Sequence, residues 1–404
     1  MTTAGTREGA GRPSLPRRWA FAGAAYMFGV TMLGTTLPTP LYPSYETRYG
    51  FGSLTTTVVY AAYAAGVLAV LLLAGSASDV VGRRPLLLAG LAASVFSAVA
   101  FATDSSLVML YVGRVFSGLS AGIFTGTATV AMVELAPARR KRQASIVASA
   151  VNMLGLGLGP LVTGVAATTL PAPLRTPYLL DLVLLLPALA AVWFLPETVP
   201  HPVRRLPTPR RPGVAAEARG VFVPAATVAF AAFAVFGLVT AIAPAFLVTL
   251  LHLPSPLLSG ALVFAMFAGS ALGQLTITPL IRRGTLLLGS AILLAGLAAI
   301  GASLATESLA TLFAGTIAVG IGQGVSFSAG IAAISAASPA GRRAETVSMF
   351  FVVAYAAISL PVVLVGVAAD AWGLRLAGIV FAAVMAALTL AAGTAVAVRA
   401  LRHS

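Results

Sequence analysis

The sequence of 404 residues lacks cysteine altogether and has few charged residues. Without cysteine the chain can form no disulfide, thiol nucleophile or thiolate metal site. Only 9% of its residues are charged and 59% are hydrophobic, whereas about a quarter of the residues of a soluble domain are charged. The histidines, His201, His252 and His403, have no second ligand at a metal-binding spacing. The composition therefore predicts a membrane protein with many spans and no metal site.

Apolar stretches long enough to cross a membrane recur along the whole chain. A helix needs about 20 apolar residues to cross a hydrocarbon core of about 30 Å. We expect an all-helical protein with twelve such spans, an even number that places both termini on one side. The expected spans cover residues 19–41, 54–74, 86–103, 106–134, 144–170, 177–196, 221–250, 256–281, 285–305, 308–337, 344–369 and 373–398.

The basic residues are divided unevenly between the two sides of these spans. The net charge of +14 invites a nucleic-acid interpretation, but 21 of the arginines and lysines lie in the tails and in alternate loops. The opposite loops hold only Arg48, Arg175 and Arg375. This bias predicts a multi-pass protein of the inner (cell) membrane with both termini in the cytoplasm and no nucleic-acid partner. Residues 1–18 are polar and basic and do not resemble a cleavable signal peptide.

A proline- and arginine-rich segment divides the chain into two similar halves. A shift of 202 residues places Gly118 on Gly320 and Gly122 on Gly324. Parallel repeats with a site between them near the midplane are a transporter architecture. The expected organisation is a cytoplasmic tail (1–18), a six-helix bundle (19–199), a cytoplasmic linker (200–220), a second six-helix bundle (221–399) and a cytoplasmic tail (400–404).

A tight, charged turn lies between the second and third expected spans. It must lie at a membrane face, because burying its charges in lipid would cost several kcal/mol. The turn resembles the loop between helices 2 and 3 of the major facilitator superfamily, G-x-L-a-D-r-x-G-r-k. Ala77 and Val80 depart from this pattern, and Val80 removes one possible gate salt bridge. The residues that match the pattern are Gly75, Asp79, Gly82, Arg83 and Arg84.

The resemblance implies an ionic gate on the cytoplasmic side. In that family an acid at the end of helix 4, here Glu134, pairs with the arginine of the turn, here Arg83. Asp79 would approach the start of the eleventh span near Ala344, where a helix dipole favours an anion. Glu345 would pair with Arg282 or Arg283 in the second half. The expected inner gate comprises Asp79, Gly82, Arg83, Arg84, Glu134 and Glu345.

Two ionisable residues inside the expected spans are candidates for proton coupling. Arg114 is costly at its depth unless it faces protein or water, and it resembles the R-x-x-q-G element of helix 4, whose arginine faces the cavity and is linked to proton transfer. The alternative is a structural arginine bonded to backbone carbonyls. Asp181 lies about one turn inside the sixth span at a similar depth, so the two residues could pair. An acid near a helix start can also be structural.

Glycines and a proline in the fifth span form a second family-like element. Proline frees a carbonyl and kinks a helix, while glycines allow close packing. The run resembles the g-x-x-x-G-P-x-x-G-G element of proton-coupled antiporters, although Thr163 replaces one glycine. The matching residues are Gly155, Gly159, Pro160 and Gly164. This element favours export.

The resemblance places a substrate cavity among the first, fourth, seventh and tenth spans. A mostly apolar lining with scattered hydroxyls and amides suits amphipathic, neutral or weakly charged compounds and lacks the dense polar ring expected for a sugar. The first span offers no acid, which disfavours a cationic substrate. The phenylalanines of the seventh span could instead be core or lipid-facing. The expected lining residues are Tyr26, Thr31, Thr35, Ser117, Phe233, Phe236, Thr240, Gln323 and Ser326.

These features together predict a proton-driven exporter of small amphipathic molecules, such as a multidrug resistance transporter. It would work as a monomer in the lipid bilayer by alternating access, without a cofactor. The alternatives are an uptake symporter or facilitator for a metabolite such as a sugar or organic acid, and a receptor or assembly factor that transports nothing. An enzyme is not expected, since no nucleophile–base pair or metal cluster occurs at any spacing.

Overall fold

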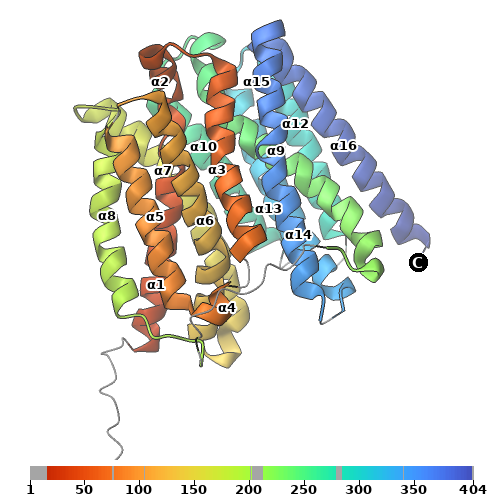
Figure 1. Cartoon of the computed structure of the whole chain (residues 1–404). Coiled ribbons are helices and arrows are strands. Elements are labelled where there is room, and N and C mark those ends of the chain that lie inside the picture. The colour runs from red at the N-terminus through yellow and green to blue at the C-terminus, as the bar shows by residue number, and fades with distance from the viewer. Residues whose placement is uncertain are drawn as a thin grey trace, which may run out of the picture.

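Twelve apolar helical segments run side by side through the protein (Figure 1). The computed structural model describes residues 16–74, 77–103, 105–200, 202, 213–278, 284–339 and 341–402. Within these residues, each of the twelve segments is long and apolar enough to cross a membrane. The predicted all-helical fold with twelve spans is therefore confirmed.

The helices of the first half form the first six spans and short connecting segments. Their bounds are α1 (Arg17–Thr36), η1 (Thr39–Leu41), α2 (Tyr42–Tyr49), α3 (Ser53–Ala74), α4 (Ala77–Val81), α5 (Arg83–Thr103), α6 (Leu107–Leu135), η2 (Ala138–Arg140), α7 (Lys141–Thr169) and α8 (Thr176–Trp193).

The helices of the second half form the remaining six spans. Their bounds are η3 (Ala216–Ala218), α9 (Arg219–Thr249), α10 (Pro256–Leu272), the π-helical turn η4 (Gly273–Ile277), α12 (Thr285–Thr306), α13 (Leu309–Ala337), α14 (Arg343–Ala357), α15 (Leu360–Trp372) and α16 (Leu374–Arg402).

Two spans differ from the simple helices that were expected. The first continues through η1 and α2, so that it extends from Arg17 to Tyr49. The eleventh is interrupted at Ile358 and Ser359, between α14 and α15. Pro361, in the first turn of α15, has no N–H to donate to the carbonyl of Ala357, so α14 cannot continue through it without losing that bond.

The internal repeat is visible in the helix contacts. A side chain at Gly118 of α6 would meet the carbonyl oxygen of Tyr63 in α3, and one at Gly320 of α13 would meet that of Met266 in α10. Helix starts also correspond, because Ser106 caps α6 and Ser308, 202 residues later, caps α13. Small residues allow such backbone contact between membrane helices. The two halves thus share one packing scheme.

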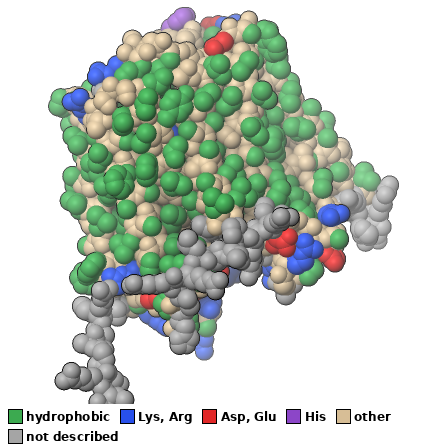
Figure 2. Space-filling model, in the orientation of Figure 1, with side chains coloured by type: hydrophobic (Ala, Val, Ile, Leu, Met, Phe, Trp, Pro, Cys, Tyr) green, Lys and Arg blue, Asp and Glu red, His purple; other side chains and the backbone are tan. Residues whose placement is uncertain are grey.

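The molecule has two polar ends separated by an apolar belt. Figure 2 shows hydrophobic side chains over the middle of one side and charged side chains near its two ends. One end carries α2 (the α2 face), and the other carries α4 (the α4 face), which the charge bias predicts to be cytoplasmic. Close approaches between the halves lie toward the α2 face, where Gly164 of α7 meets Pro256 of α10 and Gly366 of α15 meets Leu54 of α3.

Candidate functional site

A small cavity lies between the two halves in the middle of the helices. Its free volume is about 60 Å³, which suffices for a few water molecules because one water needs about 10–15 Å³ by this measure. An organic molecule therefore fits only after side chains or halves move. The cavity is lined by Thr35, Thr36, Tyr60, Tyr63, Arg114, Thr125, Asn152, Met153, Leu156, Phe233, Phe236, Thr240, Phe267, Gln323, Phe327, Phe351, Tyr355 and Ile358.

This lining includes some of the expected residues together with others. Thr35, Phe233, Phe236, Thr240 and Gln323 reach the cavity as the resemblance implied. Many of the additional residues come from helices α3, α7, α10 and α14, which were not expected to contribute. Aromatic rings dominate the lining, and among the described lining residues there is no carboxylate.

Four expected residues of the substrate site contact other parts of the protein instead. The Tyr26 hydroxyl donates to the carbonyl of Leu184 in α8 at 2.9 Å. The Ser117 hydroxyl donates to the Arg114 carbonyl within α6 at 2.9 Å. Ser326 faces Gly289 of α12, and Thr31 is buried in α1 outside the lining. Thr31, Ser117 and Ser326 each lie about one helical turn from a lining residue of their own helix, outside the lining itself.

Arg114 projects from α6 into a mostly aromatic environment. Its side chain is 1% exposed. Nη1 donates to the carbonyl oxygen of Thr35 at 2.7 Å, and Nη2 donates to the Tyr42 hydroxyl. The guanidinium carbon lies 5.3 Å from the ring centroid of Tyr42 and 5.8 Å from that of Tyr60. Arg114 thus both bonds a backbone carbonyl, as the structural alternative required, and lines the cavity.

The guanidinium of Arg114 has no anionic partner among the described residues. Its Nε is buried and has no hydrogen-bond acceptor there. Asp181 was expected as a possible partner, but it faces Gly34 of α1, whose added Cβ would lie 2.6 Å from Oδ2. The backbone of α1 therefore meets Arg114 at Thr35 and Asp181 at Gly34, and the predicted pair does not form.

Asp181 is buried in α8 at its contact with α1. Its residue is 3% exposed, and Oδ1 has no hydrogen-bond partner within the described residues. A buried carboxylate without a partner is costly when ionised. It is therefore a group on which a proton can reside in this conformation.

Gln323 belongs to a short hydrogen-bonded chain in the second half. Gln274 of η4 donates from Nε2 to Ser270 Oγ at 3.1 Å, and Ser270 of α10 donates to Gln323 Oε1 at 2.6 Å. This chain orients the amide of Gln323. Its buried Nε2 is left without an acceptor among the described residues.

The glycine–proline element of α7 packs against both halves. Pro160 cannot bond the carbonyl of Leu156, and the Thr36 hydroxyl of α1 donates to that carbonyl at 2.8 Å. Gly155 contacts Gly29 of α1 and Gly164 contacts Pro256 of α10. Gly159 likewise faces Leu33 and Thr36 of α1. The element thus joins α7 to its own half and to the other half.

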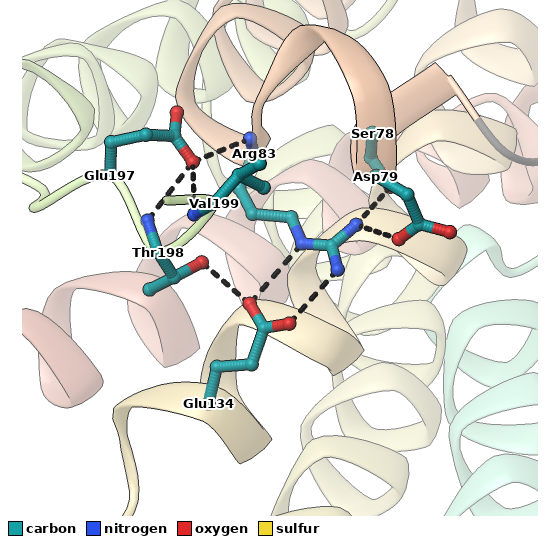
Figure 3. Close-up of polar contacts among 7 residues, drawn as sticks. All are labelled: Ser78, Asp79, Arg83, Glu134, Glu197, Thr198 and Val199. Atoms are coloured by element: carbon teal, nitrogen blue, oxygen red, sulfur yellow. Dashed lines mark hydrogen bonds and ion pairs between the residues drawn. The ribbon is translucent and has the colours of Figure 1, made fainter. Parts of the chain in front are cut away.

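Arg83 is the centre of an ionic cluster on the α4 face (Figure 3). Its Nη1 lies 2.5 Å from Asp79 Oδ1 and 2.6 Å from Ser78 Oγ. Its Nε and Nη2 donate to the two carboxylate oxygens of Glu134 at 3.2 and 2.9 Å. The Arg83 residue is only 5% exposed, so its charge is neutralised by acids from α4 and α6. The contact between Glu134 and Arg83 that the resemblance implied is present.

Glu197 is a member of this cluster that the sequence interpretation missed. Its Oε1 accepts the backbone N–H of Arg83 at 2.9 Å, and its Oε2 accepts that of Arg84 at 3.1 Å. Thr198 donates its hydroxyl to Glu134 at 2.5 Å. Gly82 has φ of +108°, and a Cβ there would lie 2.7 Å from Glu197. The segment after α8 therefore caps the start of α5, as Figure 3 shows.

The remaining gate residues have other surroundings than expected. Glu345 pairs with Arg342 at 3.1 Å, and the hydrogen bond and charge of Glu345 raise the pKa of Arg342. Its expected partners Arg282 and Arg283, like Gly75 of the turn, lie outside the described residues. The side chain of Asp79 is 63% exposed. It makes no hydrogen bond to α14 among the described residues, where an approach near Ala344 was expected. Arg84 stacks on the ring of Trp193 at 5.3 Å.

Comparisons with known proteins relate the chain to membrane transporters. The family model for the Major Facilitator Superfamily matches residues 19–305. An uncharacterized MFS-type transporter of Mycobacterium tuberculosis is 30% identical over 166 residues, covering 40% of this chain and 24% of that protein. The class H tetracycline resistance protein of Pasteurella multocida is 29% identical over 141 residues, covering 34% of this chain and 33% of that protein. These matches thus span a quarter to a third of the relatives' own lengths.

The fold resembles a solved transporter structure over nearly its whole length. That structure is a bacterial homolog to the human lysosomal transporter Spinster in an inward-facing and unoccupied conformation. The TM-score is 0.72 with 15% sequence identity, and the match covers 97% of this chain and 98% of the other.

Proposed function

The chain belongs to the Major Facilitator Superfamily, and from this membership we propose that it exports small amphipathic compounds in exchange for protons. The membrane-spanning fold and the family make it a secondary transporter. It would move its substrate by alternating access, in which one half rocks against the other and exposes a central site to each face of the membrane in turn, rather than catalyse an enzymatic reaction.

The observation that carries this proposal is the cavity between the two repeated halves. It contains a buried cation from α6 and an amide from α13, surrounded by aromatic rings. A site at the interface between repeats can be exposed alternately on each face, and its apolar walls suit an amphipathic molecule.

Two features support exchange with protons. Asp181 is buried and lacks a hydrogen-bond partner for Oδ1 among the described residues, so protonation would remove the cost of its charge. The relative from Pasteurella multocida is named as a tetracycline resistance protein, which favours outward transport. Protonation of Asp181 would bias the balance between the inward-open and outward-open states.

The ionic cluster around Arg83 would form the first half's side of the gate on the α4 face. It joins α4, α5, α6 and the segment after α8 within the first half. These contacts hold the first half together as one body while it moves. In the proposed orientation the α4 face and both termini lie in the cytoplasm, and the monomer spans the inner membrane.

Proton-driven transport can be measured in inside-out vesicles from cells that overproduce the protein. A panel of toxic compounds first identifies those to which overproduction gives resistance. Each such compound is then added to vesicles with an acidic lumen, and a pH-sensitive dye reports the lumenal proton concentration. We expect the compound to enter as protons leave. Joint movement of compound and protons in one direction would contradict export, and an unchanged dye signal would contradict proton coupling.

A further inference from the structure

The central cavity contains more hydrogen-bond donors than the protein itself uses. Nε of Arg114 and Nε2 of Gln323 are both buried and have no acceptor among the described residues. They come from opposite halves, on α6 and α13, and both residues line the cavity. A buried donor without an acceptor costs about 1–3 kcal/mol. A substrate that supplied acceptors to both would relieve these costs.

The charge of this site favours an anionic acceptor. Arg114 is buried without a carboxylate partner in the described chain, and the described cavity lining contains no acid. Its partners Thr35 and Tyr42 are neutral, and a buried cation is more favourable when an anion pairs with it. A substrate cation would add to this charge, whereas a substrate anion would neutralise it.

The donor character of Gln323 is determined by its neighbours. Ser270 already donates to Oε1 at 2.6 Å, and Gln274 donates to Ser270 at 3.1 Å. The amide oxygen is thereby occupied, and the NH₂ group remains for a ligand. If the amide of Gln323 were reversed, its NH₂ group would face Ser270 Oγ, and the Ser270 hydroxyl would lose the acceptor that it has in Oε1.

The walls of the site favour a planar ring. Phe236 of α9 lies edge-on to Phe267 of α10 with ring centroids 5.1 Å apart, and Phe233 lies 5.3 Å from Phe327 of α13. Aromatic rings prefer such edge-to-face or offset contacts with another ring. Asn152 Oδ1 also lacks a donor among the described residues, so a hydroxyl on the ring can donate to it.

We infer that the transported compounds are aromatic acids, bound in the central cavity as anions between Arg114 of the first half and Gln323 of the second. This inference specifies the substrate class of the proposed exporter and rests on that proposal only in taking the cavity as the transport site. Binding from both halves would also draw them together around the substrate, which is what a transporter needs before it changes access.

Equilibrium binding to the purified full-length protein in lipid nanodiscs tests the inference. The probes are 1-naphthoate, 1-naphthylmethylammonium and neutral 1-naphthalenemethanol, which share one ring system and differ in charge. We expect naphthoate to bind about tenfold more tightly than either of the others, a difference of about 1.4 kcal/mol. Equal or tighter binding of the ammonium or the alcohol, or no binding of naphthoate, would overturn the inference.

Variants of Gln323 test the assigned donor. Gln323→Leu keeps the approximate size of the side chain and should weaken naphthoate binding about tenfold, as expected for loss of a hydrogen bond to a charged group. Gln323→Glu should reverse the preference toward the ammonium. The matched control is Gln143→Leu, which changes an exposed glutamine of α7 and should leave binding unchanged. Unchanged naphthoate binding to Gln323→Leu would overturn the assignment.

The binding assay is independent of direction and of protons. Normal naphthoate selectivity without proton-linked transport in vesicles would contradict the proposed function alone. Proton-linked export of compounds that are not aromatic acids, with no naphthoate selectivity, would contradict this inference alone.

Discussion

The two halves of the protein share their helix packing and differ in their charges. Gly118 and Gly320 make the same backbone approach to the second span of their own half, and Ser106 and Ser308 cap the same helix. At the position of Arg114, however, the second half has Thr316. The packing scheme is therefore common to both halves, while the buried charged residues that the structure describes, Arg83, Arg114 and Asp181, all lie in the first half.

The ionic pairs on the α4 face show the same contrast. Arg83 is buried and bonded to acids from two helices, whereas the ion pair that the structure describes for Arg342 in the second half is with Glu345, three residues away. The side chain of Arg342 is 50% exposed and that of Arg83 is 7% exposed. Exposed ion pairs contribute little to stability because water screens their charges. A buried cation is destabilising once its anionic partners are removed.

Substitutions at the equivalent positions Arg114 and Thr316 should show the largest difference in efflux between the two halves. Arg114→Leu removes the cavity cation and its bonds to Thr35 and Tyr42. We expect proton-linked efflux in vesicles to fall about 100-fold or more, which corresponds to about 2.7 kcal/mol. Thr316→Val is the matched control, because the hydroxyl of Thr316 is buried without a partner in the described chain. It should retain normal efflux.

Arg114→Lys sharpens this comparison. Lysine keeps the charge but lacks the planar fork that bonds a carbonyl and a hydroxyl together, so we expect most of the loss to remain. Full activity of Arg114→Lys would mean that charge alone matters at this position. Equal losses from Arg114→Leu and Thr316→Val would remove the functional asymmetry of the halves.

The second largest effect on efflux is expected at Asp181, the buried acid of the first half. Asp181→Asn preserves size and removes the ability to release a proton, so proton-driven efflux should fall about tenfold or more. Exchange of labelled for unlabelled substrate without a proton gradient should continue. Asp370→Asn, which changes an exposed acid of α15, is the control. Undiminished proton-driven efflux by Asp181→Asn would show that this acid is structural.

The third effect compares the two arginines of the α4 face. Arg83→Ala leaves Asp79 and Glu134 without their shared cation, and we expect turnover to fall about tenfold while membrane insertion is retained. Arg342→Ala should change turnover by about twofold or less, because its pair is exposed. Transport rates normalised to the amount of protein in the membrane measure both. Similar rates for the two variants would argue against the gate.

Local sequence patterns predicted the fold, and the resemblance of the turn implied the contact between Arg83 and Glu134. The twelve spans follow from long apolar runs. Asp79 was expected near Ala344, whereas its contact with Arg83 crosses the break between α4 and α5 at Gly82. Gly118 of α6 and its repeat Gly320 of α13 make the close helix contacts that small residues allow.

Contacts that depend on the relative rotation of distant helices could not be predicted in this way. Glu197 lies 114 residues from Arg83, and nothing in its own segment indicates the turn that it caps. Asp181 and Arg114 have similar depths but approach α1 at Gly34 and Thr35 without pairing. The depth of a residue in the membrane follows from its position in the sequence. The neighbour that its side chain faces is determined by how the helices pack against one another.

The smallest effect is expected at the glycine contacts that both halves share. Gly118→Ala and Gly320→Ala each place a methyl group against the carbonyl of a neighbouring helix, Tyr63 or Met266. Overpacking of this kind costs about 1–3 kcal/mol, so the thermal unfolding temperature of the purified protein should fall by a few degrees in both variants. Gly126→Ala is the control in α6, because no atom lies within 4 Å of its added Cβ. A clear loss for Gly118→Ala with none for Gly320→Ala would show that the repeat preserves sequence without preserving the packing role, and the asymmetry of the halves would then extend to their structure.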